Sequence, residues 1–134
     1  MKLEQIQRIM IVDDNATDRF IHKKLLSIYK IGNSVIEFSS GRGALEFFRE
    51  NVSNEEKLPD LILLDVLMPE MGGFDFLFHL ESLEQDLAKA PVVYMLSSTD
   101  DESDLRQSRN IKMVKRLLRK PFSPEALIKA ISEL

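Results

Sequence analysis

Carboxylates follow two apolar runs of this sequence at positions where a buried strand would end. Asp13 and Asp14 come directly after the run Arg8–Val12, and Asp65 comes directly after the run 61–64. Short continuous apolar runs bounded by turn signals are typical of strands that are buried on both faces. In an open parallel sheet the carboxyl ends of the strands share one edge, where ligands bind. We therefore expect the three carboxylates to meet.

Such a cluster needs either raised pKa values or a bound cation. Two like charges about 4 Å apart repel by roughly 4 kcal/mol at an effective dielectric constant near 20. The sequence has no cysteine, which excludes thiolate ligands and disulfides. A set of oxygen ligands alone indicates a hard ion such as Mg²⁺. For Asp13 or Asp14 taken singly, capping of the following helix is an equally good explanation.

Two further polar residues follow predicted strands on the same edge. Ser97 comes after the run 92–96, and Lys120 comes after Val114–Arg119. Taken singly, a serine there is usually a turn or cap residue, and a lysine is usually solvated surface. Together with the carboxylates and a cation, they are the parts of a phosphoryl-transfer site. Lys120 would offset charge on the phosphoryl oxygens, and Ser97 would donate a hydrogen bond to one of them.

The hydrophobic period alternates between strand-like and helix-like along the whole chain. We expect strands at Arg8–Val12, Ser34–Phe38, 61–64, 92–96 and Val114–Arg119. We expect helices at 17–30, at about 42–50, from Gly73 onward, at about 101–109, and from the N-cap Ser123 with Pro124 in the first turn. Five alternations predict a doubly wound α/β fold with a parallel sheet and helices on both faces.

The first helix is expected to bury one apolar face. Phe20, Ile21, Leu25 and Ile28 recur at helical spacing and would form that face. His22 lies on the same helix, and His79 lies on the third. We expect each to be a surface or half-buried residue rather than a phosphoryl carrier or metal ligand.

Length and composition limit the classes of protein to consider. The 134 residues are 44% hydrophobic and carry a net charge of −4. We expect one domain over 1–134 with no second domain, because the chain stops after the fifth helix. No apolar run is long enough for a membrane span or a signal peptide, so we expect a cytoplasmic protein without membrane insertion. The acidic balance argues against direct nucleic-acid binding.

The chain closely resembles the receiver domain of two-component response regulators. The resemblance covers nearly the whole chain, in the order typical of the family, and rests on the segments 9–14, 63–73, 95–98 and 120–122. It implies a flavodoxin-like (βα)5 fold, a three-layer sandwich whose five parallel strands lie in the order 2-1-3-4-5. It also implies a phosphoacceptor switch that catalyses only its own phosphoryl transfer and dephosphorylation.

By this resemblance, Asp65 accepts a phosphoryl group from a histidine kinase or a histidine phosphotransfer protein. Asp14, Asp65 and the backbone carbonyl of Leu67 would bind Mg²⁺ directly, and Asp13 would act through a coordinated water. Ser97 would be the switch hydroxyl, with no strong acceptor in the free state, and Lys120 would bridge to the phosphoryl group. The peptide bond from Lys120 to Pro121 is expected to be cis, against about 5–6% of X–Pro bonds in general.

The same resemblance predicts how the signal leaves the domain. Phosphorylation would act on an unidentified downstream protein through the face of the fourth helix, fifth strand and fifth helix, in a monomer or a phosphorylation-dependent dimer. Leu117 departs from the family pattern, which commonly has Tyr or Phe at this position. Ser98 departs too, where a small apolar residue is frequent. Positive charge gathers near this face and is either solvated surface or a docking site for an acidic partner: Arg106, Arg109, Lys112, Lys115, Arg116 and Arg119.

Two other functions compete with the signalling switch. A phosphatase or mutase of the haloacid dehalogenase type could use Asp65 as a nucleophile, but such enzymes usually carry a second aspartate where this chain has Leu67. A pseudo-receiver that only binds partners would need no phosphorylation, although all five functional positions are filled here.

Overall fold

The computed structural model describes residues 1–99 and 102–134. Its strands are β1 (Arg8–Val12), β2 (Ser34–Phe38), β3 (Leu61–Asp65), β4 (Val92–Ser97) and β5 (Val114–Arg119). Its helices are α1 (Ala16–Ile28), α2 (Gly41–Glu50), α3 (Gly73–Glu81), α4 (Glu102–Arg109) and α5 (Pro124–Ser132), with short 3-10 turns η1 (Leu3–Gln5) and η2 (Glu84–Asp86). The predicted strands and helices are confirmed. Asp65 and Ser97 are the last residues of their strands, and Asp101, the expected start of the fourth helix, lies outside the described residues.

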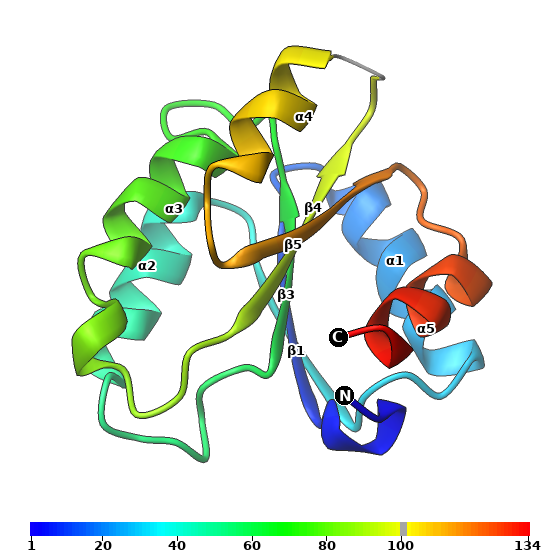
Figure 1. The fold of residues 1–134 in the computed structure, drawn as a ribbon, viewed down its shortest axis with the longest axis horizontal. Coiled ribbons are helices and arrows are strands. Elements are labelled where there is room, and N and C mark those ends of the chain that lie inside the picture. The colour runs from blue at the N-terminus through cyan, green and yellow to red at the C-terminus, as the bar shows by residue number, and fades with distance from the viewer. Residues whose placement is uncertain (100–101) are drawn as a thin grey trace.

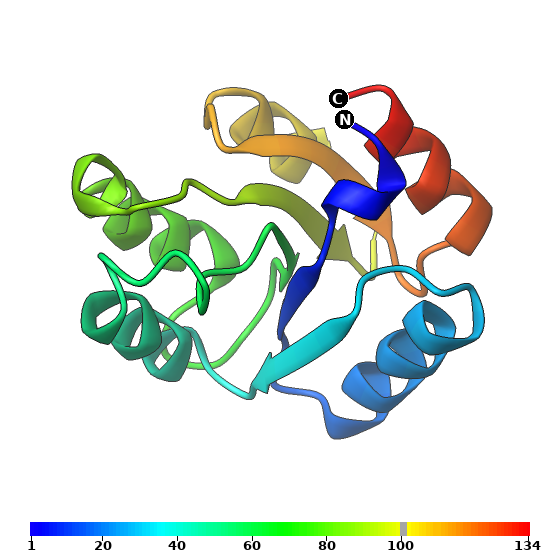
Figure 2. The same cartoon turned by 90° about the horizontal axis from the view of Figure 1, so that it is seen from below.

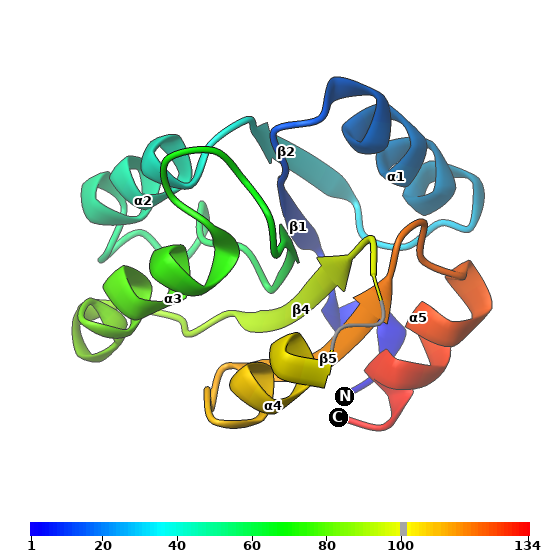
Figure 3. The ribbon, with the colours of Figure 1, turned by 90° about the horizontal axis from the view of Figure 1, so that it is seen from above.

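The strands form one parallel sheet in the order β2-β1-β3-β4-β5. Helices α1 and α5 cover one face, and α2 and α3 cover the other, with α4 beside β5 (Figures 1 and 3). Figure 2 shows the same layers from below and places the two chain ends side by side. The predicted doubly wound, flavodoxin-like fold with its strand order is therefore confirmed.

The sheet separates two hydrophobic cores. Strand β3 is buried along its whole length, and its side chains alternate between the two. Ile62 and Leu64 pack with α2 and α3. Leu61 and Leu63 pack with α1 and α5. A strand between two layers of helices must be apolar on both faces, which explains the continuous apolar run that precedes Asp65.

The predicted apolar face of α1 is largely wrong, since of its four residues only Leu25 packs against the core, and it is half-buried. Phe20 and Ile28 are 68% and 60% exposed, and Ile21 is exposed as well. The helix instead buries His22 and Leu26. The buried face carries polar residues because it runs past the polar end of the sheet, so apolar periodicity identified the wrong face. His22 is 1% exposed, which corrects the expectation of a surface or half-buried residue, whereas His79 is exposed.

Candidate functional site

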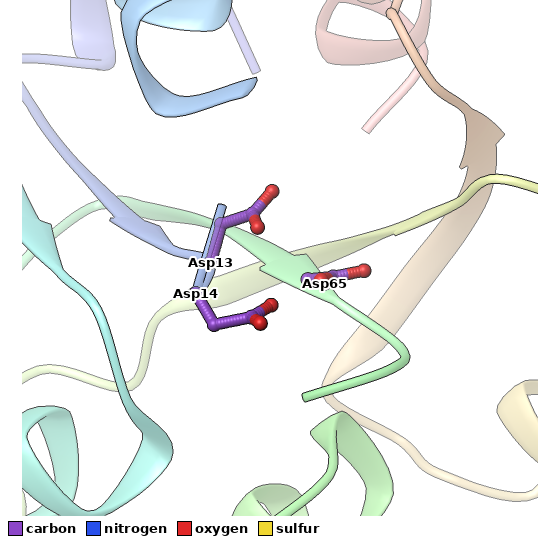
Figure 4. Close-up of side chains that lie close together, drawn as sticks. All are labelled: Asp13, Asp14 and Asp65. Atoms are coloured by element: carbon purple, nitrogen blue, oxygen red, sulfur yellow. The ribbon is translucent and has the colours of Figure 1, made fainter. Parts of the chain in front are cut away.

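Three carboxylates meet at the carboxyl edge of the sheet. Asp13 and Asp14 follow β1, and Asp65 ends β3, as Figure 4 shows. One carboxylate oxygen from each residue lies within 4.8 Å of the other two. Asp13 and Asp65 are buried, whereas Asp14 is exposed. Two buried anions so close together cost free energy unless positive charge lies beside them.

Lys120 supplies positive charge at this cluster. Its Nζ lies 2.7 Å from Asp13 Oδ2, 2.9 Å from Asp18 Oδ2 and 3.4 Å from Asp65 Oδ1. Burial alone would lower the pKa of Lys120, but hydrogen bonds to Asp13 and Asp18 raise it above its ordinary value. The backbone N–H of Lys120 donates to the Ser97 carbonyl at 2.8 Å, and the peptide bond to Pro121 is cis. The ammonium is therefore fixed and fully charged.

Asp65 has an unusual affinity for a proton. Burial and the neighbouring Asp13 carboxylate raise the pKa of Asp65 to about 6, and Lys120 partly opposes them. The backbone N–H of Leu67 also donates to Asp65 Oδ1, at 3.3 Å. Leu67, two residues after Asp65, is 69% exposed. At neutral pH the carboxylate is ionised but poorly stabilised, which suits a nucleophile.

The donor set fits Mg²⁺. Carboxylate oxygens are the ligands that this ion prefers, and the exposed side of the cluster at Asp14 leaves room for the water molecules that it retains. A cation there would relieve the repulsion between Asp13 and Asp65 that raises the pKa of Asp65. That the Leu67 carbonyl is a ligand, and that Asp13 acts through water, stay predictions.

The Ser97 hydroxyl is already hydrogen-bonded to the backbone of Thr99, two residues further along the chain. Its hydroxyl donates to the Thr99 carbonyl at 2.9 Å and accepts from the Thr99 N–H at 3.1 Å. The expectation that Ser97 has no strong acceptor in the free state is therefore wrong. The chain bends at Ser98 and Thr99, and the Thr99 carbonyl supplies the acceptor. A switch at Ser97 must exchange these bonds for another partner.

A surface cavity of about 190 Å³ adjoins Ser97 between β4, α4 and β5. It is lined by Ser97, Thr99, Glu102, Leu105, Leu117, Leu118 and Arg119. Leu117 is half-buried there. Part of the nearby positive charge is paired, since Arg106 lies 3.7 Å from Glu102 and Arg116 lies 3.4 Å from Glu133. The cavity gives the half-buried side chain of Leu117 space beside Ser97.

Asp18 belongs to this site, although we did not predict it from the sequence. It lies in the first turn of α1, whose N-cap Asn15 accepts a hydrogen bond from the Asp18 N–H at 3.0 Å. Its contact with Lys120 joins residues 102 positions apart. The N-cap residue Asn15 could have indicated that Asp18 lies near the site, because a helix that begins there starts beside the strand ends.

His22 lies one helical turn beyond Asp18 and is buried. Its ring stacks on Phe122, with ring centroids 5.1 Å apart. Its Nδ1 has no hydrogen-bond partner among the described residues. Burial lowers the pKa of His22, although the Asp13 carboxylate opposes this. A neutral ring therefore packs the loop after Lys120 against α1.

Residues 9–132 match the model of the response regulator receiver domain. The two-component response regulator ORR1 of Oryza sativa subsp. japonica is 32% identical over 99 residues, which cover 72% of this chain and 42% of the rice protein. Protein PilH of Pseudomonas aeruginosa is 29% identical over 93% of this chain and 94% of its own.

A response regulator receiver protein from Dyadobacter fermentans has a similar structure, with a TM-score of 0.82, 31% identity, and coverage of 95% of this chain and 96% of that one. The chain thus spans less than half of the rice protein. No helix among the described residues is long and apolar enough to cross a membrane. On the family match and these likenesses, the chain belongs to the family of response regulator receiver domains.

Proposed function

We propose that this chain is a phosphorylation switch of a two-component phosphorelay, with Asp65 as the phosphoacceptor. The observation that carries the proposal is the convergence of Asp13, Asp14, Asp65 and Lys120 at one edge of the sheet. A carboxylate with a raised pKa, next to a fixed ammonium, is suited to attack phosphorus.

In the proposed reaction, one carboxylate oxygen of Asp65 forms a bond to the phosphorus of a phosphohistidine. The phosphorus–nitrogen bond breaks, and its electron pair stays on the imidazole, which takes up a proton. Lys120 offsets the charge on the phosphoryl oxygens. Asp14, Asp65 and the Leu67 carbonyl would hold Mg²⁺ directly, and Asp13 would act through a coordinated water; the ion supplies further positive charge for those oxygens when it is bound.

The donor is a histidine kinase or a histidine phosphotransfer protein. After transfer, the new oxygens offer the Ser97 hydroxyl a charged acceptor, which competes with its bond to the Thr99 carbonyl. Ser97 then moves toward Asp65 and changes the cavity beside Leu117, and so the face of α4, β5 and α5. A downstream protein reads this face by contact, and the chain acts as a monomer or as a dimer that forms on phosphorylation.

Intact-mass spectrometry after incubation with acetyl phosphate and Mg²⁺ tests the proposal. The wild-type chain should gain the mass of one phosphoryl group, and Asp65→Asn should gain none, because an amide cannot form the acyl phosphate. Asp86→Asn is the matched control, since Asp86 is an exposed aspartate of η2, before β4 and so at the opposite end of the sheet. Equal incorporation by Asp65→Asn, or none by the wild type, would contradict the proposal.

A further inference from the structure

The Lys120 ammonium carries one positive charge and contacts three carboxylates. Asp13, which is buried, already contacts the ammonium at 2.7 Å. Asp18 approaches from α1 to 2.9 Å, closer than Asp65 at 3.4 Å. Asp18 keeps about a third of its side chain exposed, so water could solvate its charge without the lysine. Its contact with Lys120 is therefore not forced by burial.

The ammonium lies closer to Asp13 and Asp18 than to Asp65. An ammonium has three N–H donors, and the short contacts to Asp13 and Asp18 take two of them, which leaves one for Asp65 at the longer distance. Asp18 is held in place from its own side, because its N–H is bound by the cap residue Asn15. The start of α1 thus fixes the backbone position from which the Asp18 side chain reaches Lys120.

We propose that Asp18 is a positioning residue that keeps the Lys120 ammonium from closer contact with Asp65 in the unphosphorylated chain and must release it when a phosphoryl group arrives. This role rests on the proposed function of Asp65. Breaking the contact opposes phosphorylation, so Asp18 sets how readily the switch is occupied. By linkage, any partner that draws Asp18 away from Lys120 favours the phosphorylated state.

A purely structural role predicts something different. Asp18 lies in the first turn of α1, where a negative charge stabilises the helix dipole. If that were its whole contribution, removing the charge would lower stability and leave anion binding at Asp65 unchanged or weaker. A positioning role predicts stronger anion binding instead.

The experiment measures the affinity of beryllofluoride, which binds to a carboxylate as a mimic of the phosphoryl group, by calorimetry in excess Mg²⁺. Asp18→Asn keeps the shape of the side chain and removes its charge. It should lower the Kd by on the order of tenfold, since the added anion no longer competes for Lys120 with a carboxylate that is partly screened by solvent. Asp18→Glu keeps the charge and should stay within about twofold of the wild type. Asp86→Asn makes the same change of net charge far from the site and should have no effect.

A second measurement reports the lysine directly. In protein labelled with ¹⁵N at the lysine side chains, the Nζ signal of Lys120, identified by its loss in Lys120→Arg, should shift when beryllofluoride binds. In resting Asp18→Asn this signal should already lie toward the bound position. A purely structural role would leave it in the wild-type position.

The outcomes distinguish the phosphoacceptor function of Asp65 from the positioning role of Asp18. If the wild type binds no beryllofluoride, both the phosphoacceptor function and the role of Asp18 fall. If the wild type binds it and Asp18→Asn binds equally or more weakly, only the role of Asp18 is overturned. An unchanged Lys120 signal in Asp18→Asn overturns it as well, even if the affinity rises, because the effect would then be one of charge alone.

Discussion

A buried carboxylate next to another carboxylate binds protons more tightly in the folded chain than in the unfolded one. Asp65 is such a group: burial and Asp13 raise its pKa to about 6, against about 3.9 for a free aspartate. The folded state therefore retains the proton of Asp65 to a higher pH than the unfolded state does. Stability must then decrease as the pH rises through this interval.

We expect the free energy of unfolding without Mg²⁺ to fall between about pH 4 and pH 6 by up to about 3 kcal/mol on account of Asp65, and to remain lower above pH 6. Urea denaturation of the wild type and of Asp65→Asn over this range isolates the contribution. The stability of Asp65→Asn relative to the wild type should increase with pH, because the amide does not ionise. Two parallel curves would contradict the raised pKa.

At the scale of single residues, strand ends were the most reliable guide. Asp13, Asp65, Ser97 and Lys120 could be placed at one edge because each comes at the end of a predicted strand and all parallel strands end together. Asp18 could not be placed in this way, because its role depends on a contact with a residue 102 positions away. The Ser97 bond to Thr99 was also missed, since it depends on the path of a turn.

At the scale of secondary-structure elements, the close approach of α3 to β3 constrains the backbone of Asp65, the proposed phosphoacceptor. A Cβ atom added at Gly73 would overlap the carbonyl oxygen of Asp65 and lie 3.1 Å from the Cα of Val66. Both neighbours are backbone atoms, which cannot move aside without moving the end of β3. Glycine at the start of α3 thus allows the helix to begin against the site.

Gly73→Ala should lower the free energy of unfolding by about 1–3 kcal/mol, as overpacking does, and should also slow phosphate incorporation from acetyl phosphate. Gly72→Ala is the matched control, because a Cβ there would come no closer than 3.4 Å to the Val66 carbonyl oxygen. It should cost less than about 1 kcal/mol, as alanine is a weaker N-cap than glycine. Equal stability losses in the two variants would contradict the close approach.

Helix α1 shows where element-level prediction fails. The helix itself was predictable from its period, but its buried face was not, since that face includes Asp18 and His22 beside Leu26. Hydrophobic periodicity assumes that the buried face is the apolar one. A helix that borders a polar site breaks this assumption, and Phe20 is left exposed.

At the scale of the whole molecule, the charge at the sheet edge is linked to the stability of the fold. The repulsion of Asp65 by Asp13 and Asp14 arises only when the chain folds and brings them together. A cation that binds the folded chain therefore stabilises it by mass action.

Adding Mg²⁺ should raise the melting temperature, with a stabilisation of about 2.7 kcal/mol at a hundredfold excess over Kd. Asp14→Asn should reduce this gain, because it removes an exposed ligand without disturbing the buried pair. Asp86→Asn should show the full gain. A melting temperature that does not respond to Mg²⁺, measured by calorimetry at neutral pH, would contradict a metal site here.

The continuous burial of β3 has a consequence for where motion can occur. Its amides lie between two cores, so they can exchange with solvent only when the whole chain opens. Strand β5 lies at the edge of the sheet, and its side chains are half-buried or exposed, so its amides can exchange through local fraying. Asp65 ends the strand in the most protected part of the chain, whereas Leu117 lies in the strand at the margin. The proposed phosphoryl site thus keeps its geometry during local openings of β5, which give the proposed output face of α4, β5 and α5 its freedom to change.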